Sequence, residues 1–173
     1  MCVVQNKSFF AARQHAFLSS RVTFHCTKMP IYMKPKFHVY GRLPAGRYWV
    51  GDPCYVIPNE TWPTFCKAMY PDSRGPPKVG VFWLPDGTKY AGFTTKYGDG
   101  LYESYGKTEQ MFCVDSGSIA CIPVDALPDD KLPGNGHIMH FDKSFFVAYD
   151  AENGTIIFDD LYIPTDWFDE DVA

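Results

Sequence analysis

Long apolar runs are missing from this chain, and so are the motifs that mark several common enzyme classes. No stretch of about 18 apolar residues exists, so the sequence predicts no membrane-spanning helix. The phosphate-binding pattern GxxxxGK[ST] and the dinucleotide pattern GxGxxG are both absent, which argues against nucleotide sites of the common kinds. We therefore expect no membrane span and no cofactor.

Acidic residues are missing from the first part of the chain. Residues 1–51 contain eight Lys or Arg and no Asp or Glu, whereas residues 52–173 contain eight Lys or Arg and all 20 acids. The overall net charge of -4 therefore averages a segment of +8 and a segment of -12. This asymmetry predicts a basic leader or arm over residues 1–35, followed by a single β-rich domain over residues 36–173.

Three interpretations of the basic leader stay open. Residues 1–28 are rich in Ser, Ala, Phe and basic side chains and contain no acid, a composition typical of an organelle transit peptide. Alternatively, translation starts at Met29 or Met33, or the segment is a retained arm that binds an acidic surface such as nucleic acid. A secretory signal is disfavoured because no apolar run of about seven residues follows the charges.

Closely spaced metal ligands are lacking as well. The six cysteines contain no CxxC motif, so they do not have the spacing of a zinc site. His137 and His140 would face opposite sides of a strand, which disfavours a shared metal. We therefore predict no metal and free thiols in a reducing intracellular compartment, with a bridge between Cys113 and Cys121 as the alternative.

Turn residues and aromatic side chains are abundant. The chain has 14 Gly and 14 Pro, and 17% of its residues are aromatic, which is typical of short strands joined by tight turns. Asn153-Gly154, Pro85-Asp86-Gly87 and Gly98-Asp99-Gly100 each predict a hairpin, and Ser116-Gly117 predicts a hairpin or a bulge. The predicted strands are 37–40, 47–50, 54–57, 79–84, 88–97, 101–105, 110–114, 118–124, 137–141, 145–151 and 155–163.

One helix is predicted over residues 59–70. Its apolar residues Trp62, Phe65, Cys66 and Met69 recur at helical spacing and form one stripe. Because short turns join successive strands, the predicted fold class is all-β, or β-rich α+β. We expect an antiparallel meander that closes into a sandwich or barrel, covered by this one helix.

Carboxylates at turns are the candidates for catalytic chemistry. Asp52 and Cys54 lie where a strand ends at Gly51-Asp52-Pro53, and Asp99 and Asp115 lie at two later turns. Three converging carboxylates could bind a divalent cation or act as acid and base, and the Cys54 thiol could act as a nucleophile. The alternative is structural, since turns favour Asp for local hydrogen bonds and a free Cys is often a core residue.

Tyrosines near the turns are the candidates for binding. We expect Tyr55, Tyr97, Tyr102 and Tyr105 on outer faces, where such rings stack on sugars or bases or anchor a protein interface. The alternative is that they pack between the sheets. Nucleic-acid binding by the body is disfavoured by its charge of -12, because phosphate contacts need cations.

Three segments together carry a resemblance to other proteins: GRYWVGDPCYVIP at 46–58, YGDGLY at 97–102 and VDSGSIACIP at 114–123. In these segments the chain resembles a loosely defined set of small uncharacterised proteins of phages and bacteria. The resemblance covers about residues 42–124 and carries no established activity. It implies that Asp52, Cys54, Asp99 and Asp115 are the positions that matter.

These observations favour a non-enzymatic binding or assembly protein. Its partner would be another protein, bound through an aromatic face and the basic arm, as in a virion or another multi-subunit complex. The first alternative is a small hydrolase that uses Asp52, Asp99 and Asp115, with or without a metal. The second is an accessory subunit of an organelle complex, which only the leader suggests.

Overall fold

The structure is a computed structural model, and it describes residues 37–72, 74–129, 132 and 134–166. The chain divides into two units between Lys34 and Pro35. All the described residues belong to the second unit.

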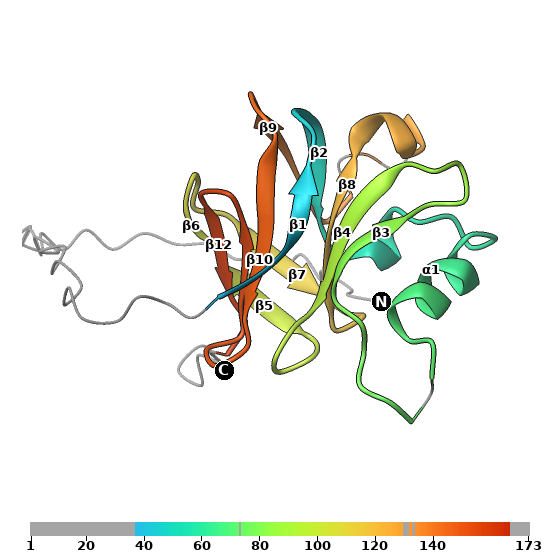
Figure 1. Cartoon of the computed structure of the whole chain (residues 1–173), viewed down its shortest axis with the longest axis horizontal. Helices are drawn as coiled ribbons and strands as arrows, with labels where there is room; N and C mark the ends of the chain where they lie inside the picture. The colour runs from blue at the N-terminus through green and yellow to red at the C-terminus, as the bar shows by residue number, and fades with distance from the viewer. Residues whose placement is uncertain (1–36, 73, 130–131, 133, 167–173) are drawn as a thin grey trace, which may run out of the picture. The chain divides into compact units, whose positions relative to one another are not determined.

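Antiparallel strands form three sheets in this unit. One sheet has the order β1-β10-β11-β12-β6, the second has the order β3-β4-β8-β2-β9, and β5 pairs with β7 alone (Figure 1). The strands are β1 (His38–Leu43), β2 (Gly46–Gly51), β3 (Gly80–Trp83), β4 (Lys89–Thr94), β5 (Gly100–Glu103), β6 (Tyr105–Gly106), β7 (Met111–Val114), β8 (Ser118–Pro123), β9 (His137–Phe141), β10 (Phe145–Asp150), β11 (Thr155–Phe158) and β12 (Leu161–Pro164).

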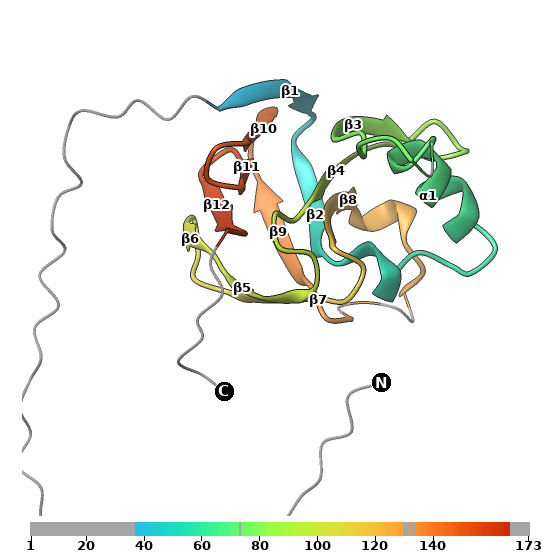
Figure 2. The same cartoon turned by 90° about the horizontal axis from the view of Figure 1, so that it is seen from below.

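The sheets pack against each other around a shared core, which confirms the predicted β-rich fold. Figure 2 shows β10, β11 and β12 on one side, β2 and β8 on the other, and β5 and β7 below. Aromatic side chains fill the space between them: Tyr48 packs edge-on against Phe145, and Phe93 packs edge-on against Phe158. Over the described residues the sheets do not close into a barrel, so the sandwich alternative holds.

Helix α1 (Trp62–Met69) covers the outer face of the second sheet, as predicted (Figure 1). Phe65 and Met69 are buried there in a second cluster that includes Trp49 and Tyr90. The apolar stripe is therefore a packing face, because alternate residues of the central strands face this side and need cover from water.

Two of the predicted turns were assigned to the wrong kind of connection. Gly98–Gly100 joins β4 to β5, and Ser116-Gly117 joins β7 to β8, yet neither pair of strands is hydrogen bonded. Both segments move the chain from one sheet to another. A glycine turn marks a change of chain direction and does not say which sheet the next strand joins.

Two predicted strands also need correction. Residues 54–57 were expected to be extended, but Pro53–Tyr55 forms the short 3₁₀ helix η1. Residues 155–163 were expected to form one strand, but β11 and β12 form a hairpin whose turn is Asp159–Asp160, with Asp159 at a φ of 56°. Asp tolerates that left-handed conformation better than most residues, so this turn needs no glycine.

Other predicted features match the structure. Pro85–Gly87 lies in the turn of the β3–β4 hairpin, and Asn153-Gly154 lies in the loop between β10 and β11. That second loop has four residues, because Asp150 pairs with Thr155.

The predicted alternative of a disulfide bridge between Cys113 and Cys121 is wrong, because both thiols are free and their strands β7 and β8 are not paired.

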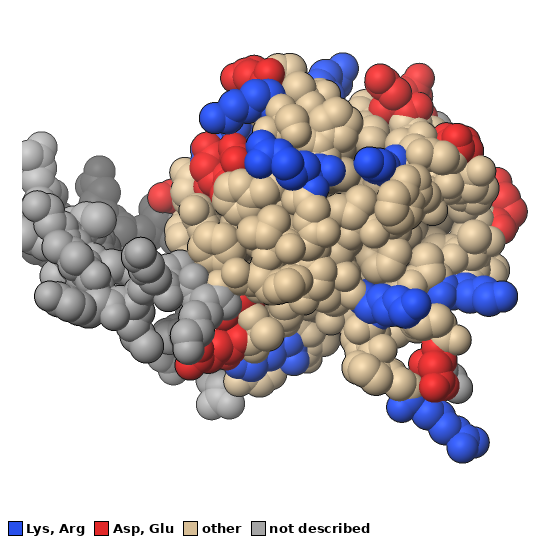
Figure 3. All heavy atoms as spheres, in the orientation of Figure 1, with Lys and Arg blue, Asp and Glu red and all other residues tan. Residues whose placement is uncertain are grey.

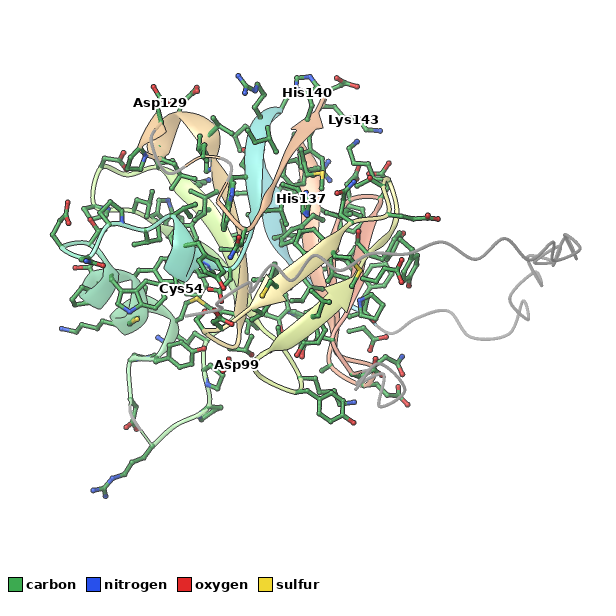
Figure 4. The ribbon with its side chains drawn as sticks, turned by 180° about the vertical axis from the view of Figure 1, so that it is seen from behind. Cys54, Asp99, Asp129, His137, His140 and Lys143 are labelled. Atoms are coloured by element: carbon green, nitrogen blue, oxygen red, sulfur yellow. The ribbon has the colours of Figure 1, made fainter. Side chains whose placement is uncertain are left out.

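Charged side chains are distributed unevenly over one face of the unit. In the orientation of Figure 1 the front is largely free of charge, and Lys, Arg, Asp and Glu lie mainly around its rim (Figure 3). The strands β5 and β7 lie on the opposite side, which Figure 4 shows from behind.

Candidate functional site

Asp52 lies where β2 ends, and its backbone is extended with a ψ of 117° because Pro53 follows it. Its carboxylate caps η1: the Cys54 N–H donates a hydrogen bond of 2.9 Å to Oδ1. Although Cys54 was predicted to begin a strand, this cap and the preceding proline turn the chain into a 3₁₀ helix.

The same carboxylate also holds the turn between β7 and β8. Its Oδ2 accepts hydrogen bonds from the backbone N–H groups of Asp115 (2.6 Å) and Ser116 (2.7 Å), and its Oδ1 accepts one from the Ser116 hydroxyl (2.5 Å). With Cys54 N–H, four donors meet a side chain that is 0% exposed. A carboxylate has about four lone-pair sites, and these four donors, with the Cys54 thiol beside them, occupy the Asp52 carboxylate.

Tyr55 joins this group from the end of η1. Its hydroxyl donates to Oδ2 of Asp115 and lies 3.9 Å from Sγ of Cys113. The hydrogen bond to Asp115 raises the pKa of Tyr55, because the bond favours the protonated phenol. We call Asp52, Cys54, Tyr55, Asp115 and Ser116 the Asp52 corner.

Cys54 is exposed to solvent, but the predicted carboxylates lie near enough to act on its thiol. Partial burial, then a hydrogen bond to Asp52, then the charges of Asp52, Asp115 and Asp99 together raise the pKa of this thiol to about 12. The structure thus brings all four predicted catalytic residues to one place, and Figure 4 shows Cys54 and Asp99 on the same side of the unit. A thiol with this pKa stays protonated at neutral pH, so it is a poor nucleophile.

The arrangement offers little for metal-dependent chemistry. Within residues 37–72, 74–129, 132 and 134–166, no group of three or more His, Cys, Asp and Glu residues is arranged to hold a metal ion. His140 instead forms an exposed pair with Asp142 at 2.9 Å, and His137 contacts the carbonyl oxygen of Met111 at 2.8 Å.

The four predicted binding tyrosines lie in different environments. Tyr97 is 58% exposed, and Tyr105 is 43% exposed and stacks on Tyr162. Tyr102 corrects the prediction, because its ring is buried in the core and its hydroxyl donates to the Gly98 carbonyl oxygen at 2.9 Å. It alternates with Leu101 along β5, and the side chain that faces outward is Leu101.

Sequence reasoning missed an apolar outer surface on β5 and β7. Leu101 is 60% exposed and Met111 is 45% exposed, whereas Tyr102 and Phe112 on the inner face are buried. Leu101 pairs with Cys113, so Met111 is its diagonal neighbour, within reach of a long side chain. We call Leu101, Met111 and Cys113 the β5–β7 face. Glu103, which pairs directly with Met111, is exposed on the same face, so the alternation Leu101–Tyr102–Glu103 was the signal that placed Leu101 outside.

A hollow of about 330 Å³ lies beside this face. It separates β9 from residues 107–110, and its lining includes Lys107, Gln110 and Ile138. The His137 ring, which also lines the hollow, contacts the Met111 carbonyl oxygen at 2.8 Å. Ile138, on the β9 side of the hollow, is 42% exposed.

The chain matches no protein-family model, and no curated protein and no solved structure matches it. Among the described residues, no helix has the length and apolar character needed to cross a membrane.

Proposed function

We propose that this chain is a non-enzymatic binding or assembly protein whose partner docks on the β5–β7 face and the adjoining Ile138. The observation that carries this proposal is the outward exposure of Leu101 and Met111 on neighbouring strands, next in the chain to Gln110, which lines the hollow together with the exposed Ile138. Apolar side chains grouped in this way at a surface mark interaction sites more often than single exposed ones do.

The aromatic surface expected from the sequence contributes less to this site than aliphatic side chains do. Tyr55 contacts Cys113 of the β5–β7 face, but its hydroxyl is bound to Asp115. Tyr105 is exposed and stacked on Tyr162, so its ring is fixed in place for a partner. Pre-ordered side chains lose little entropy when a partner covers them.

The hydrolase alternative receives weaker support. It requires Asp52 to bind a metal or move a proton, and four hydrogen-bond donors already occupy that buried carboxylate. It also gains nothing from Cys54, whose raised thiol pKa keeps the sulfur protonated. The geometry instead gives both residues a role in holding the turns together.

The basic arm and the organelle-complex alternative both depend on residues 1–36, which lie outside the described residues. They stay predictions, as do the virion assignment and the resemblance to small phage and bacterial proteins.

The test compares three purified forms of the full chain as baits in native extract. The double variant Leu101→Glu with Met111→Glu places charge on the β5–β7 face, and Trp83→Glu is the control, because Trp83 is also 60% exposed but lies on β3. We expect the wild-type chain and the Trp83→Glu control to retain one partner protein from the extract, and the double variant to lose it. The same partner, once purified, should bind the wild-type chain again. A strictly monomeric wild type that retains no such partner would contradict the proposal.

A further inference from the structure

The two large sheets have four edge strands, and three of them are covered or very short. β1 and β3 lie against each other: a Cβ added at Gly41 would lie 2.9 Å from Val81, and one added at Gly80 would lie 2.9 Å from Tyr40. β6 has only two residues. Short or covered edges are ways in which proteins avoid unwanted strand pairing.

β9 is the exception. Its five residues, His137–Phe141, pair with β2 on one side, and no strand of the described residues pairs with it on the other. It carries no proline and no Asp, Glu, Lys or Arg, the residues that commonly protect an edge. Figure 4 shows His137 and His140 along this strand.

The hollow of about 330 Å³ runs beside β9, and four residues of that strand line it. The opposite wall is formed by Lys107, Thr108 and Gln110, which also offer polar groups. A strand laid in this space would extend the second sheet and meet backbone N–H and C=O groups that β2 does not use.

The ionisable side chains that line the hollow are all basic. Lys107 is positive, the imidazoles of His137 and His140 are neutral or positive, and no carboxylate of the described residues lines the hollow. Lys107 lies 3.7 Å from Asp160 and over the Phe141 ring of β9, and its side chain is partly exposed; His140 lies 2.9 Å from Asp142 in a solvent-exposed pair. Such pairs contribute little and can exchange partners. An acidic segment therefore suits the hollow.

A second copy of this chain suits it less. Pairing β9 with β9 of another molecule would bring two sets of Lys107, His137 and His140 together, and like charges across paired strands are destabilising.

We propose that β9 binds an extended, carboxylate-bearing segment of another protein by strand addition, with Lys107 contacting its carboxylates. This inference rests on the proposed binding function and names the kind of partner and the way it binds. Main-chain hydrogen bonds to β9 supply the affinity, and the basic wall selects against basic segments.

The test uses two labelled peptides that alternate valine with glutamate or valine with lysine, titrated into the full chain by fluorescence anisotropy. We expect the glutamate peptide to bind at least about tenfold more tightly than the lysine peptide. Ile138→Glu and Lys107→Ala should each weaken it several-fold, whereas Trp83→Glu on the covered edge should not. Hydrogen exchange should show new protection of backbone N–H groups within His137–Phe141.

Four results would overturn strand addition: equal binding of both peptides, no binding of the glutamate peptide, no added protection in β9, or concentration-dependent dimers of the free chain that Ile138→Glu abolishes. The proposed binding function can hold while strand addition fails. If the partner captured from extract is lost on changing Leu101 and Met111 but is unaffected by Ile138→Glu and Lys107→Ala, the β5–β7 face binds it without strand addition.

Discussion

The polar groups of the Asp52 corner are hydrogen bonded within the protein, whereas those along the free edge of β9 have no strand partner among the described residues. At the corner, one carboxylate that is 0% exposed meets four donors. Along β9, one side of the backbone has no strand partner among the described residues, and Ile138 is 42% exposed. The predicted catalytic acid Asp52 is thus fully engaged in hydrogen bonds within the fold, whereas β9, which the sequence pointed out only for its two histidines, keeps an edge without a strand partner in the described part of the chain.

The difference follows from the cost of leaving polar groups unpaired. A buried donor without an acceptor destabilises the folded state, so each unpaired donor at the corner would reduce the stability of the protein. An exposed edge is hydrated and costs little in the free protein. It can therefore remain open until a partner replaces the water.

The largest effect should come from Asp52→Ala. This change removes the acceptor of three backbone N–H groups and one hydroxyl, so we expect the free energy of unfolding to fall by about 3–5 kcal/mol. Urea denaturation followed by circular dichroism measures it. Asp52→Asn, which retains the volume but presents an amide to the donors, should also be strongly destabilising.

The control for Asp52→Ala is Asp86→Ala. Asp86 accepts a similar bond from the Thr88 N–H in the β3–β4 turn, but it is exposed and reaches no second segment. Its replacement should change stability much less. Comparable losses at the two positions would mean that Asp52 is an ordinary turn residue and that the corner does not hold the sheets together.

Ser116→Ala should have the next largest effect. It deletes the hydroxyl that donates to Oδ1 of Asp52 but leaves the three backbone donors in place. The expected loss is about 1–2 kcal/mol, because a hydrogen bond to a charged group contributes more than a neutral one. Ser144→Ala, at an exposed serine bonded to Arg42, is the matched control. Urea denaturation measures both variants, and equal losses of stability in Ser116→Ala and Ser144→Ala would contradict the prediction.

Local patterns predicted the elements better than they predicted the connections between sheets. The alternation and turn residues located most strands, and the stripe on α1 identified its buried face. The hairpin turn at Asp159 was missed because no glycine marks it, and the change of sheet after Gly98 was missed because local sequence does not encode it.

The sequence identified individual residues of the candidate site but not the contacts between them. Asp52 and Asp115 were each recognised at a turn, but their contact joins positions 63 apart in the sequence, and no periodicity reports such a contact. Tyr102 was placed outside because tyrosine is common at interfaces. On β5 the alternation places Leu101 on the same face as the charged Glu103 and Tyr102 on the opposite face, a signal that the prediction for Tyr102 did not use.

Alkaline pH should weaken the corner. Partial burial and nearby carboxylates raise the pKa of the Cys54 thiol from 9.0 to about 12. The native thiol therefore keeps a proton that the unfolded thiol loses above about pH 9. Because the native state then binds more protons, this thiol's contribution is present below about pH 9 and is lost as pH rises toward about 12.

Two measurements check this pH dependence. Thermal unfolding should occur at progressively lower temperature above about pH 9, and less steeply in Cys54→Ala. Alkylation of Cys54 by iodoacetamide, followed by mass spectrometry, should be slow at neutral pH and faster in Asp115→Asn, which removes one of the charges that raise the thiol pKa. Rapid alkylation of the wild-type thiol at neutral pH would contradict the assignment of Cys54 as unreactive.

The smallest effect on stability should come from Ile138→Glu, although this variant should weaken peptide binding several-fold. Ile138 is exposed on a strand whose outer side has no strand partner among the described residues, so the added charge stays hydrated, and unfolding should change by less than about 0.5 kcal/mol. Trp83→Glu should be similarly neutral for folding and leave peptide binding intact. A large loss of stability in Ile138→Glu would mean that β9 is covered in the free protein, and the contrast with the Asp52 corner would then disappear. If Ile138→Glu unfolds like the wild type but no longer binds the peptide, then β9 contributes to binding and the Asp52 corner contributes to stability.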